Sequence, residues 1–171
     1  MDRQARAGRR QPGVVFPFTS TPELARQAAA ACKYPPEGLR GAGPGLATFR
    51  WPAPEGYYQF ANKNVMVIII IEQARAVEQI DEIASVPGID VMFIGTNDLS
   101  FSLGVGGQQN HPKVQEAIAK VVAAGKGRKI PSGRPAGNLE QLQQKERFSV
   151  RDRLLQPLGK SGIDLKTRPL Y

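Results

Sequence analysis

Two acidic residues, Glu72 and Asp98, each follow an apolar run that is typical of a buried strand. The first run, residues 65–71, ends directly at Glu72, and the second, residues 91–94, leads through a short glycine-containing segment to Asp98. A right-handed crossover makes the two strands parallel, so both acidic side chains emerge at the carboxyl end of one sheet. Two carboxylates at one point repel each other unless a proton or a cation separates them, and a hard divalent cation with oxygen ligands suits that position.

A structural use of the same two residues is also consistent with this spacing. Glu72 can cap the helix that follows it, and Asp98 can be a turn residue whose carboxylate accepts backbone N–H groups. The spacing alone does not choose between a metal site and these roles.

The segment between the two apolar runs has the pattern of an amphipathic helix. Within residues 74–86, apolar residues recur at helical spacing and charged residues take the other face, and Pro87 and Gly88 then end the helix. Residues 65–100 therefore predict a β-α-β unit, and the fold class is α/β with a parallel sheet.

Several motifs in and around this unit occur in an order and spacing that resemble one enzyme family. They cover residues 34–38, 40–44, 71–72, 76–83, 86–90, 93–95, 98–100 and 111–115. Together they are similar to the core of the HpcH/HpaI aldolases, which are metal-dependent pyruvate aldolases that act on substrates such as 4-hydroxy-2-oxoheptanedioate and 2-dehydro-3-deoxyglucarate. The resemblance covers about residues 14–142.

The resemblance implies a fold, an activity and a set of site residues. The fold would be a partial (β/α)8 TIM barrel of about five parallel strands, because a complete barrel usually needs ~250 residues. The activity would be that of a carbon–carbon lyase, an aldehyde-lyase that cleaves a 4-hydroxy-2-oxo acid to pyruvate and an aldehyde. Glu72 and Asp98 match the family's ligands for a divalent metal, Mg²⁺, Mn²⁺ or Co²⁺. The loop of Gly95, Thr96, Asn97 and Asp98 matches the backbone that receives the pyruvate carboxylate.

A second glycine-rich loop, residues 38–45, precedes the central strand and contains Arg40 and Gly43. Its functional interpretation is a loop that approaches an anionic substrate, with both residues contributing to binding. The alternative is that it is an ordinary connecting loop rich in turn residues, with no part in binding.

Other parts of the family pattern are missing. The family's acid/base histidine and the arginine that holds the pyruvyl keto oxygen have no counterpart here, so the catalytic residues are unassigned. The family's glutamine two places before the glutamate is replaced by Ile70, and its Pro-Ala before the aspartate by Thr96 and Asn97. A non-catalytic remnant, or a binding subunit that pairs with a full-length aldolase, is therefore the alternative hypothesis.

Charge and length divide the 171 residues into three parts. We expect a basic, disordered leader at residues 1–12, a barrel domain at 13–142 and a loosely ordered basic tail at 143–171. The net charge is +8, but residues 13–125 hold eight Lys and Arg against ten Asp and Glu. The core therefore lacks the basic patch that nucleic-acid binding requires, and a basic-tail nucleic-acid binder is a distant third hypothesis.

The same composition bounds the location and the partners. The lone Cys32 fits a reducing, cytoplasmic environment, and the longest apolar run is far shorter than a membrane span. The expected partners are a small 2-oxo acid substrate and other subunits, either copies of this chain or a full-length relative, because an unclosed parallel sheet leaves its edges exposed.

Local signals predict the remaining elements. A short strand over residues 13–17 precedes a helix that Thr21 caps and that runs to Cys32, with Leu24, Ala28 and Ala31 as its buried stripe. A helix over 114–124 follows His111, which we interpret as a cap or surface residue, and a strand follows at 129–133.

Overall fold

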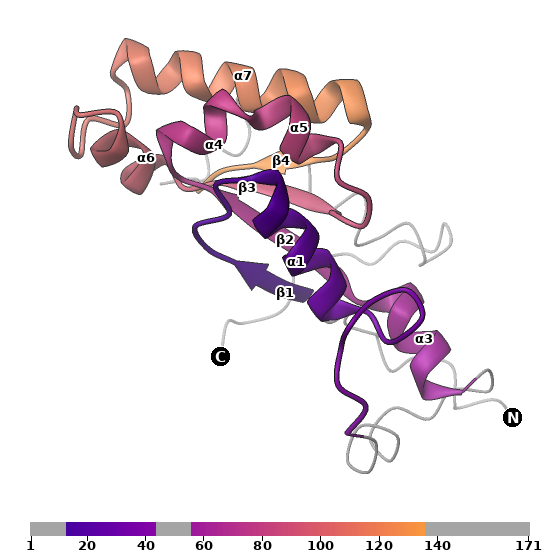
Figure 1. Ribbon diagram of the computed structural model, residues 1–171. Coiled ribbons are helices and arrows are strands. Elements are labelled where there is room, and N and C mark those ends of the chain that lie inside the picture. Colours follow the sequence, from indigo (N-terminus) through magenta and orange to yellow (C-terminus); the bar gives the residue numbers. More distant parts are fainter. Residues whose placement is uncertain (1–12, 44–55, 136–171) are drawn as a thin grey trace, which may run out of the picture.

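The computed structural model describes residues 13–43 and 56–135, and within them the chain forms a four-stranded parallel sheet. The strands lie in sequence order, β1-β2-β3-β4 (Figure 1). Their bounds are Gly13–Phe16, Met66–Ile71, Val91–Ile94 and Ser132–Gly133. The registers place Val15 beside Ile68 and Ile71 beside Ile94. The α/β fold class is confirmed, with four strands described where about five were expected.

Helices separate the strands along the chain. They are α1 (Pro22–Cys32), α3 (Tyr57–Asn64), α4 (Ala74–Glu78), α5 (Ile80–Ala84), α6 (Thr96–Ser102) and α7 (Pro112–Arg128). Four of them, α1, α4, α5 and α7, lie on one face of the sheet (Figure 1). The other two lie at its ends, α6 beyond the carboxyl ends of the strands and α3 at the amino end of β2.

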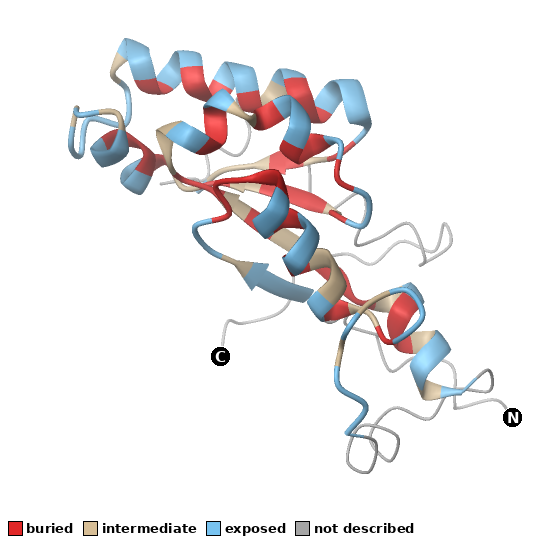
Figure 2. Cartoon of the chain, in the orientation of Figure 1, coloured by how far each residue is buried: buried red, intermediate tan, exposed pale blue. Residues whose placement is uncertain are grey.

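The core lies between the sheet and the helix layer. Val67, Ile69 and Ile71 of β2 are fully buried and belong to the same apolar cluster as Ile83 of α5 and Val121 of α7. The strand residues between them are less covered, since Ile68 and Ile70 are only half-buried (Figure 2). The uninterrupted apolar run predicted burial on both faces, and among the described residues only the face toward the helices is fully covered.

The first helix begins where the sequence predicts. The Thr21 side chain accepts a hydrogen bond from the Leu24 backbone N–H at 3.3 Å, and Pro22 occupies the first turn. The predicted stripe was wrong in part: Ala28 is buried, but Leu24 is 40% exposed and Ala31 is exposed. Ala25 and Cys32 face the core instead.

Two other predictions need correction. The single helix over 74–86 is two short helices, because Gln79 leaves helical geometry at φ −106° and ψ 20°. The Gly95–Asp98 segment is not a loop throughout, since α6 begins at Thr96. The leader at 1–12 and the tail at 143–171 lie outside the described residues.

None of the helices in residues 13–43 and 56–135 combines the length and apolarity that a bilayer-spanning segment requires.

Candidate active site and metal centre

Glu72 is the first residue after β2 and carries a buried carboxylate. It is 6% exposed, and its Oε1 accepts a hydrogen bond of 2.7 Å from the backbone N–H of Phe18. Glu72 does not cap α4, whose N-cap is Gln73 with no side-chain hydrogen bond. The capping alternative for Glu72 is therefore wrong.

The carboxyl end of β3 meets Glu72 at Gly95. The Gly95 N–H donates to the Ile71 carbonyl at 3.0 Å, and a Cβ at Gly95 would stand 2.8 Å from Glu72 Cβ and 2.9 Å from Glu72 Oε2. Only a residue without a side chain leaves this space to the carboxylate. Glu72 is therefore held between the ends of β1 and β3, with one oxygen toward each.

Asp98 lies in the first turn of α6, which starts directly after Gly95. Its side chain is exposed. Because β2 and β3 are parallel neighbours, Glu72 and α6 lie beyond the same edge of the sheet (Figure 1). The structure thus places both predicted ligands at one end of the strands.

The electrostatics around Glu72 and Asp98 fit a divalent cation. The ion pairs within the described residues join Arg26 to Glu23 and Lys120 to Glu116, and neither predicted ligand takes part in them. A buried carboxylate without a cationic partner is costly, and a bound cation removes that cost. Across residues 13–43 and 56–135, no group of three or more His, Cys, Asp or Glu converges on one point. If Glu72 and Asp98 bind a cation together, they supply two carboxylates, and Mg²⁺ held by one or two carboxylates keeps its other positions for water or substrate.

Thr96 and Asn97, in the predicted loop, form hydrogen bonds with other residues of the chain. Thr96 is buried, and its hydroxyl hydrogen-bonds to Gln109 Oε1 at 2.7 Å, while the Asn97 carbonyl accepts from the Ser100 hydroxyl at 2.6 Å. The backbone N–H groups in the first turn of a helix have no intrahelical acceptor. The first turn of α6 therefore offers donors at the same edge as Glu72.

Arg40 is not brought to this edge, which corrects its predicted place, and Gly43 has no described neighbour within 4 Å of its Cβ position. The Arg40 N–H donates to the Lys33 carbonyl at the end of α1, and its guanidinium lies 4.6 Å from the centre of the Tyr34 ring. Tyr34 in turn hydrogen-bonds through its backbone to Asn62, shortly before β2 begins. Because α1 runs antiparallel to the strands, its carboxyl end lies at the amino end of the sheet (Figure 1). Arg40 is hydrogen-bonded to Lys33 there and therefore lies opposite Glu72.

His111 has the capping role that the sequence indicates. It is the N-cap of α7, and its Nδ1 accepts a hydrogen bond from the Lys113 N–H at 3.2 Å.

Sequence reasoning missed Phe18, which supplies the hydrogen bond to Glu72. The available signal was Pro17, because proline favours the second position of a turn and so marks the end of β1. The partner itself lies 54 residues away and has no sequence signature.

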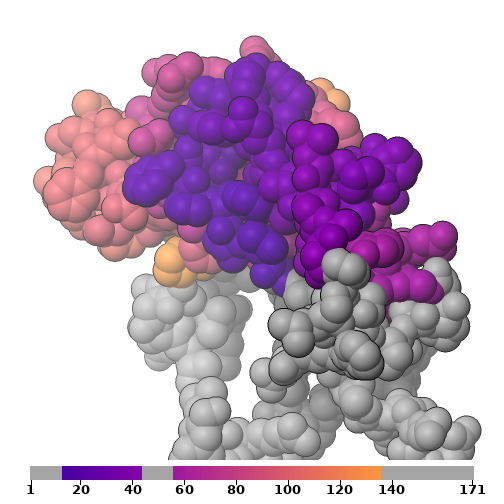
Figure 3. Space-filling view, turned by 60° about the horizontal axis from the view of Figure 1, so that its bottom comes forward, coloured from indigo at the N-terminus to yellow at the C-terminus, as the bar shows by residue number. Residues whose placement is uncertain are grey.

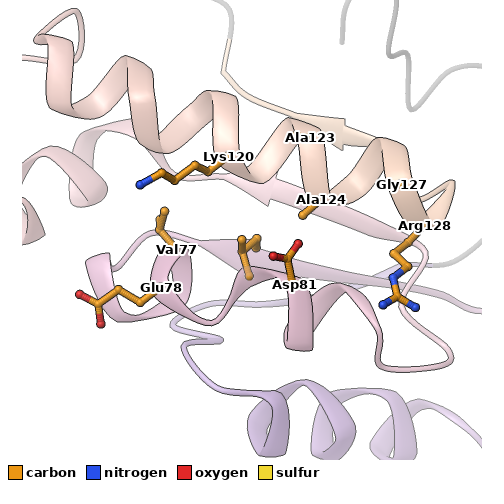
Figure 4. Close-up of a pocket in the computed structure, with 9 residues that line it drawn as sticks. Val77, Glu78, Asp81, Lys120, Ala123, Ala124, Gly127 and Arg128 are labelled. Atoms are coloured by element: carbon orange, nitrogen blue, oxygen red, sulfur yellow. The ribbon is translucent and has the colours of Figure 1, made fainter.

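A groove of about 580 Å³ lies elsewhere, between α7 and the α4–α5 pair (Figure 4). Glu78 and Asp81 line one wall, and Lys120 and Arg128 line the other. None of the predicted site residues borders it, so it is separate from the candidate site.

Comparison with known proteins decides the family. Residues 4–134 match the model of the HpcH/HpaI aldolase/citrate lyase family. The chain belongs to this family. As an HpcH/HpaI chain it has curated relatives that include the 5-keto-4-deoxy-D-glucarate aldolase of Shigella sonnei, 36% identical over 75% of this chain and 49% of the relative. Another is the hydroxypyruvate/pyruvate aldolase of Sagittula stellata, 40% identical over 70% of this chain and 47% of the relative.

Solved HpcH/HpaI structures have the same fold. A family protein from Burkholderia cenocepacia superposes with a TM-score of 0.72 at 37% identity, over 77% of this chain and 53% of that one. The HpcH/HpaI aldolase from Desulfitobacterium hafniense gives a TM-score of 0.70 at 34% identity, with 77% and 51% covered. The chain therefore spans about half the length of the relatives it matches. A partial TIM-type barrel is consistent with that coverage.

Proposed function

We propose that this chain is a carbon–carbon lyase that cleaves a 4-hydroxy-2-oxo acid to pyruvate and an aldehyde, with Glu72 and Asp98 holding a divalent metal. The observation that carries the proposal is the buried Glu72 carboxylate, which forms no ion pair with any residue in 13–43 or 56–135 and lies at the same strand edge as Asp98. Membership of the family and the aldolase names of the relatives support the reaction class. A cytoplasmic location is part of the proposal.

The chain's own residues have distinct tasks in this scheme. A bound metal would supply Lewis-acid chemistry, which stabilises the negative charge that develops on the substrate as its C–C bond breaks. Glu72 and Asp98 would hold the metal, and the backbone N–H groups of Thr96, Asn97 and Asp98 would orient the substrate carboxylate, since the Gly95 N–H already donates to the Ile71 carbonyl. The base that takes the 4-hydroxyl proton is not assigned among the described residues.

The test combines a metal titration with an assay for pyruvate. Mn²⁺ and Mg²⁺ binding is measured by calorimetry, and pyruvate release from a 4-hydroxy-2-oxo acid is followed with and without the metal. Glu72→Gln and Asp98→Asn should each weaken Mn²⁺ binding by more than about 100-fold, because outer-shell partners alone are worth 10–100-fold. Glu78→Gln and Asp81→Asn, carboxylates on the helix layer, are the matched controls and should leave binding unchanged. Equal effects in both pairs would reject the site.

A second candidate is a non-catalytic subunit that pairs through the edge of its sheet. The observation that favours it is the exposure of β1, in which Val14 is 42% and Val15 51% exposed. Metal binding without pyruvate release, together with a mixed oligomer formed with a full-length aldolase, would select this function. Pyruvate release by the isolated chain would exclude it.

A further inference from the structure

The turn after β1 holds Phe18 in an unusual conformation. Pro17 follows the strand, and Phe18 then has φ +51°, so the pair has the proline and the positive φ of a type II turn. The Thr19 hydroxyl closes the turn by donating to the Phe16 carbonyl at 3.1 Å. Glycine is the usual residue at the third position, and a bulky side chain there is strained.

The Phe18 ring gains little from this arrangement, but its backbone N–H gains a partner. The residue is 59% exposed, whereas its N–H donates to the buried Glu72 Oε1 at 2.7 Å. Glu72 Oε2 faces Gly95, where the missing side chain leaves room for it. One oxygen is therefore occupied on the β1 side, and the other remains on the β3 side, next to the helix that carries Asp98.

We propose that Phe18 is a positioning residue for Glu72: its N–H fixes the carboxylate so that Oε2 is presented to the metal shared with Asp98. This inference rests on the proposed metal-binding function. An ordered hydrogen-bond donor stops rotation of the carboxylate and leaves one oxygen for the cation. Outer-shell partners of this kind typically contribute 10–100-fold to metal affinity.

A backbone ester tests the donor directly. Incorporating phenyllactic acid in place of Phe18 replaces the N–H with an oxygen and keeps the ring. The matched control is leucic acid in place of Leu24, which removes an N–H that donates to the Thr21 side chain and not to Glu72. Calorimetry measures the Mn²⁺ affinity of each form, and circular dichroism measures its unfolding.

We expect the Phe18 ester to weaken Mn²⁺ binding by about 10–100-fold, and the Leu24 ester to leave it within about threefold. If the Phe18 ester does not fold, Thr19→Val takes its place. Valine has a volume similar to that of threonine, so it fits the buried site, but it removes the hydroxyl that closes the turn by donating to the Phe16 carbonyl.

The outcomes separate this inference from the function on which it rests. If the wild type binds Mn²⁺ and the Phe18 ester binds it with the same affinity, the positioning role is overturned and the metal site remains. The same holds for Thr19→Val where that variant is used. An equal loss in the Leu24 ester would show a general effect on the fold and would also overturn it. Failure of the wild type to bind Mn²⁺ would overturn both proposals.

Discussion

At the carboxyl edge of the sheet, the position of the Glu72 side chain depends on the shape of the residues packed around it. Glu72 is buried between Phe18 and Gly95, so its carboxylate has little freedom to adjust. Interiors of proteins are closely packed, and an added methyl group there must displace a neighbour. Small substitutions at this edge are therefore informative about the whole site.

Gly95→Ala should disturb Glu72 and lower stability. The new Cβ would stand 2.8 Å from Glu72 Cβ and 2.9 Å from its Oε2, and relief of such overlap costs about 1–3 kcal/mol. Urea unfolding measures the loss, and a Mn²⁺ titration shows whether the displaced carboxylate still binds. Gly43→Ala is the control, because no atom of the described residues lies within 4 Å of its Cβ position, and it should change neither quantity. A stable Gly95→Ala variant would contradict the packing described.

Cys32 should make the protein less stable in alkali. Burial raises the pKa of its thiol above the ordinary value of 9.0, although Arg40 and Lys33 oppose the shift. Above about pH 9 the unfolded chain releases the thiol proton while the folded chain still keeps it. The free energy of unfolding that the thiol contributes is therefore fully present below the pKa of the unfolded chain and falls as the pH rises above it. The free energy of unfolding, measured from pH 7 to 10.5, should fall less steeply in Cys32→Ala. Equal slopes would show that the thiol is not responsible.

At the level of single residues, sequence reasoning placed Glu72 well because a strand end fixes it. It misplaced Arg40, since a glycine-rich loop gives no sign of the end of the sheet at which it lies. It could not find Phe18, because the contact depends on a positive φ at a residue type that rarely adopts one.

Among the elements, α7 shows most directly how a helix is fitted to its sheet. It packs against α5 and β3, and it ends at Arg128, after which the C-cap residue Lys129 adopts left-handed geometry at φ +59°. Two glycines in its last turns, Gly125 and Gly127, have opposite surroundings. A Cβ at Gly125 would lie 2.7 Å from the Ile130 carbonyl oxygen, whereas no atom of residues 13–43 and 56–135 lies within 4 Å of one at Gly127.

Alanine at these two positions should have opposite effects. Gly127→Ala should raise stability by about 0.5 kcal/mol, because glycine in a helix costs conformational entropy. Gly125→Ala should lower it by about 1–3 kcal/mol, since the clash is with backbone that cannot rotate away. Thermal unfolding of the two variants measures both changes, each serving as the control for the other. The same sign in both would show that helix propensity, not packing, governs this segment.

Elements were predicted from periodicity with uneven success. The strands predicted over residues 65–71 and 91–94 were confirmed, and so were the caps at Thr21 and His111, because local rules determine them. The break at Gln79 was not predicted, since a helical pattern of apolar residues continues across it. The stripe of α1 was partly wrong because alanine at successive positions leaves the buried face poorly defined.

For the molecule as a whole, the exposed edge of the sheet is the main liability. In the space-filling view the segment from β1 to α1, in indigo, forms much of the face toward the viewer (Figure 3). Val14 and Val15 of β1 are both substantially exposed. An apolar edge strand is a template for pairing with another chain.

Val15→Lys should reduce self-association without unfolding the protein. Val15 is 51% exposed, so a lysine there can reach water, and a charge on an edge strand opposes pairing. Light scattering over a range of protein concentrations measures association, and circular dichroism checks the fold. Leu39→Lys, at a residue that is 83% exposed and outside the strands, is the control. Association that persists equally in both variants would point to a different surface.

The register of the sheet also predicts the order in which its strands fold. In the sheet register, 53 residues separate Gly13 from its partner Met66, whereas Ile68 and Val91 are only 23 apart. Closing the longer loop costs more chain entropy, by roughly 0.7 kcal/mol for a loop about twice as long. Folding should therefore begin with β2, α4, α5 and β3, and β1 should dock last and detach first. In native-state hydrogen exchange, the amides of β1 should lose their protection before those of β2, which would uncover the Glu72 carboxylate whenever the first strand is away.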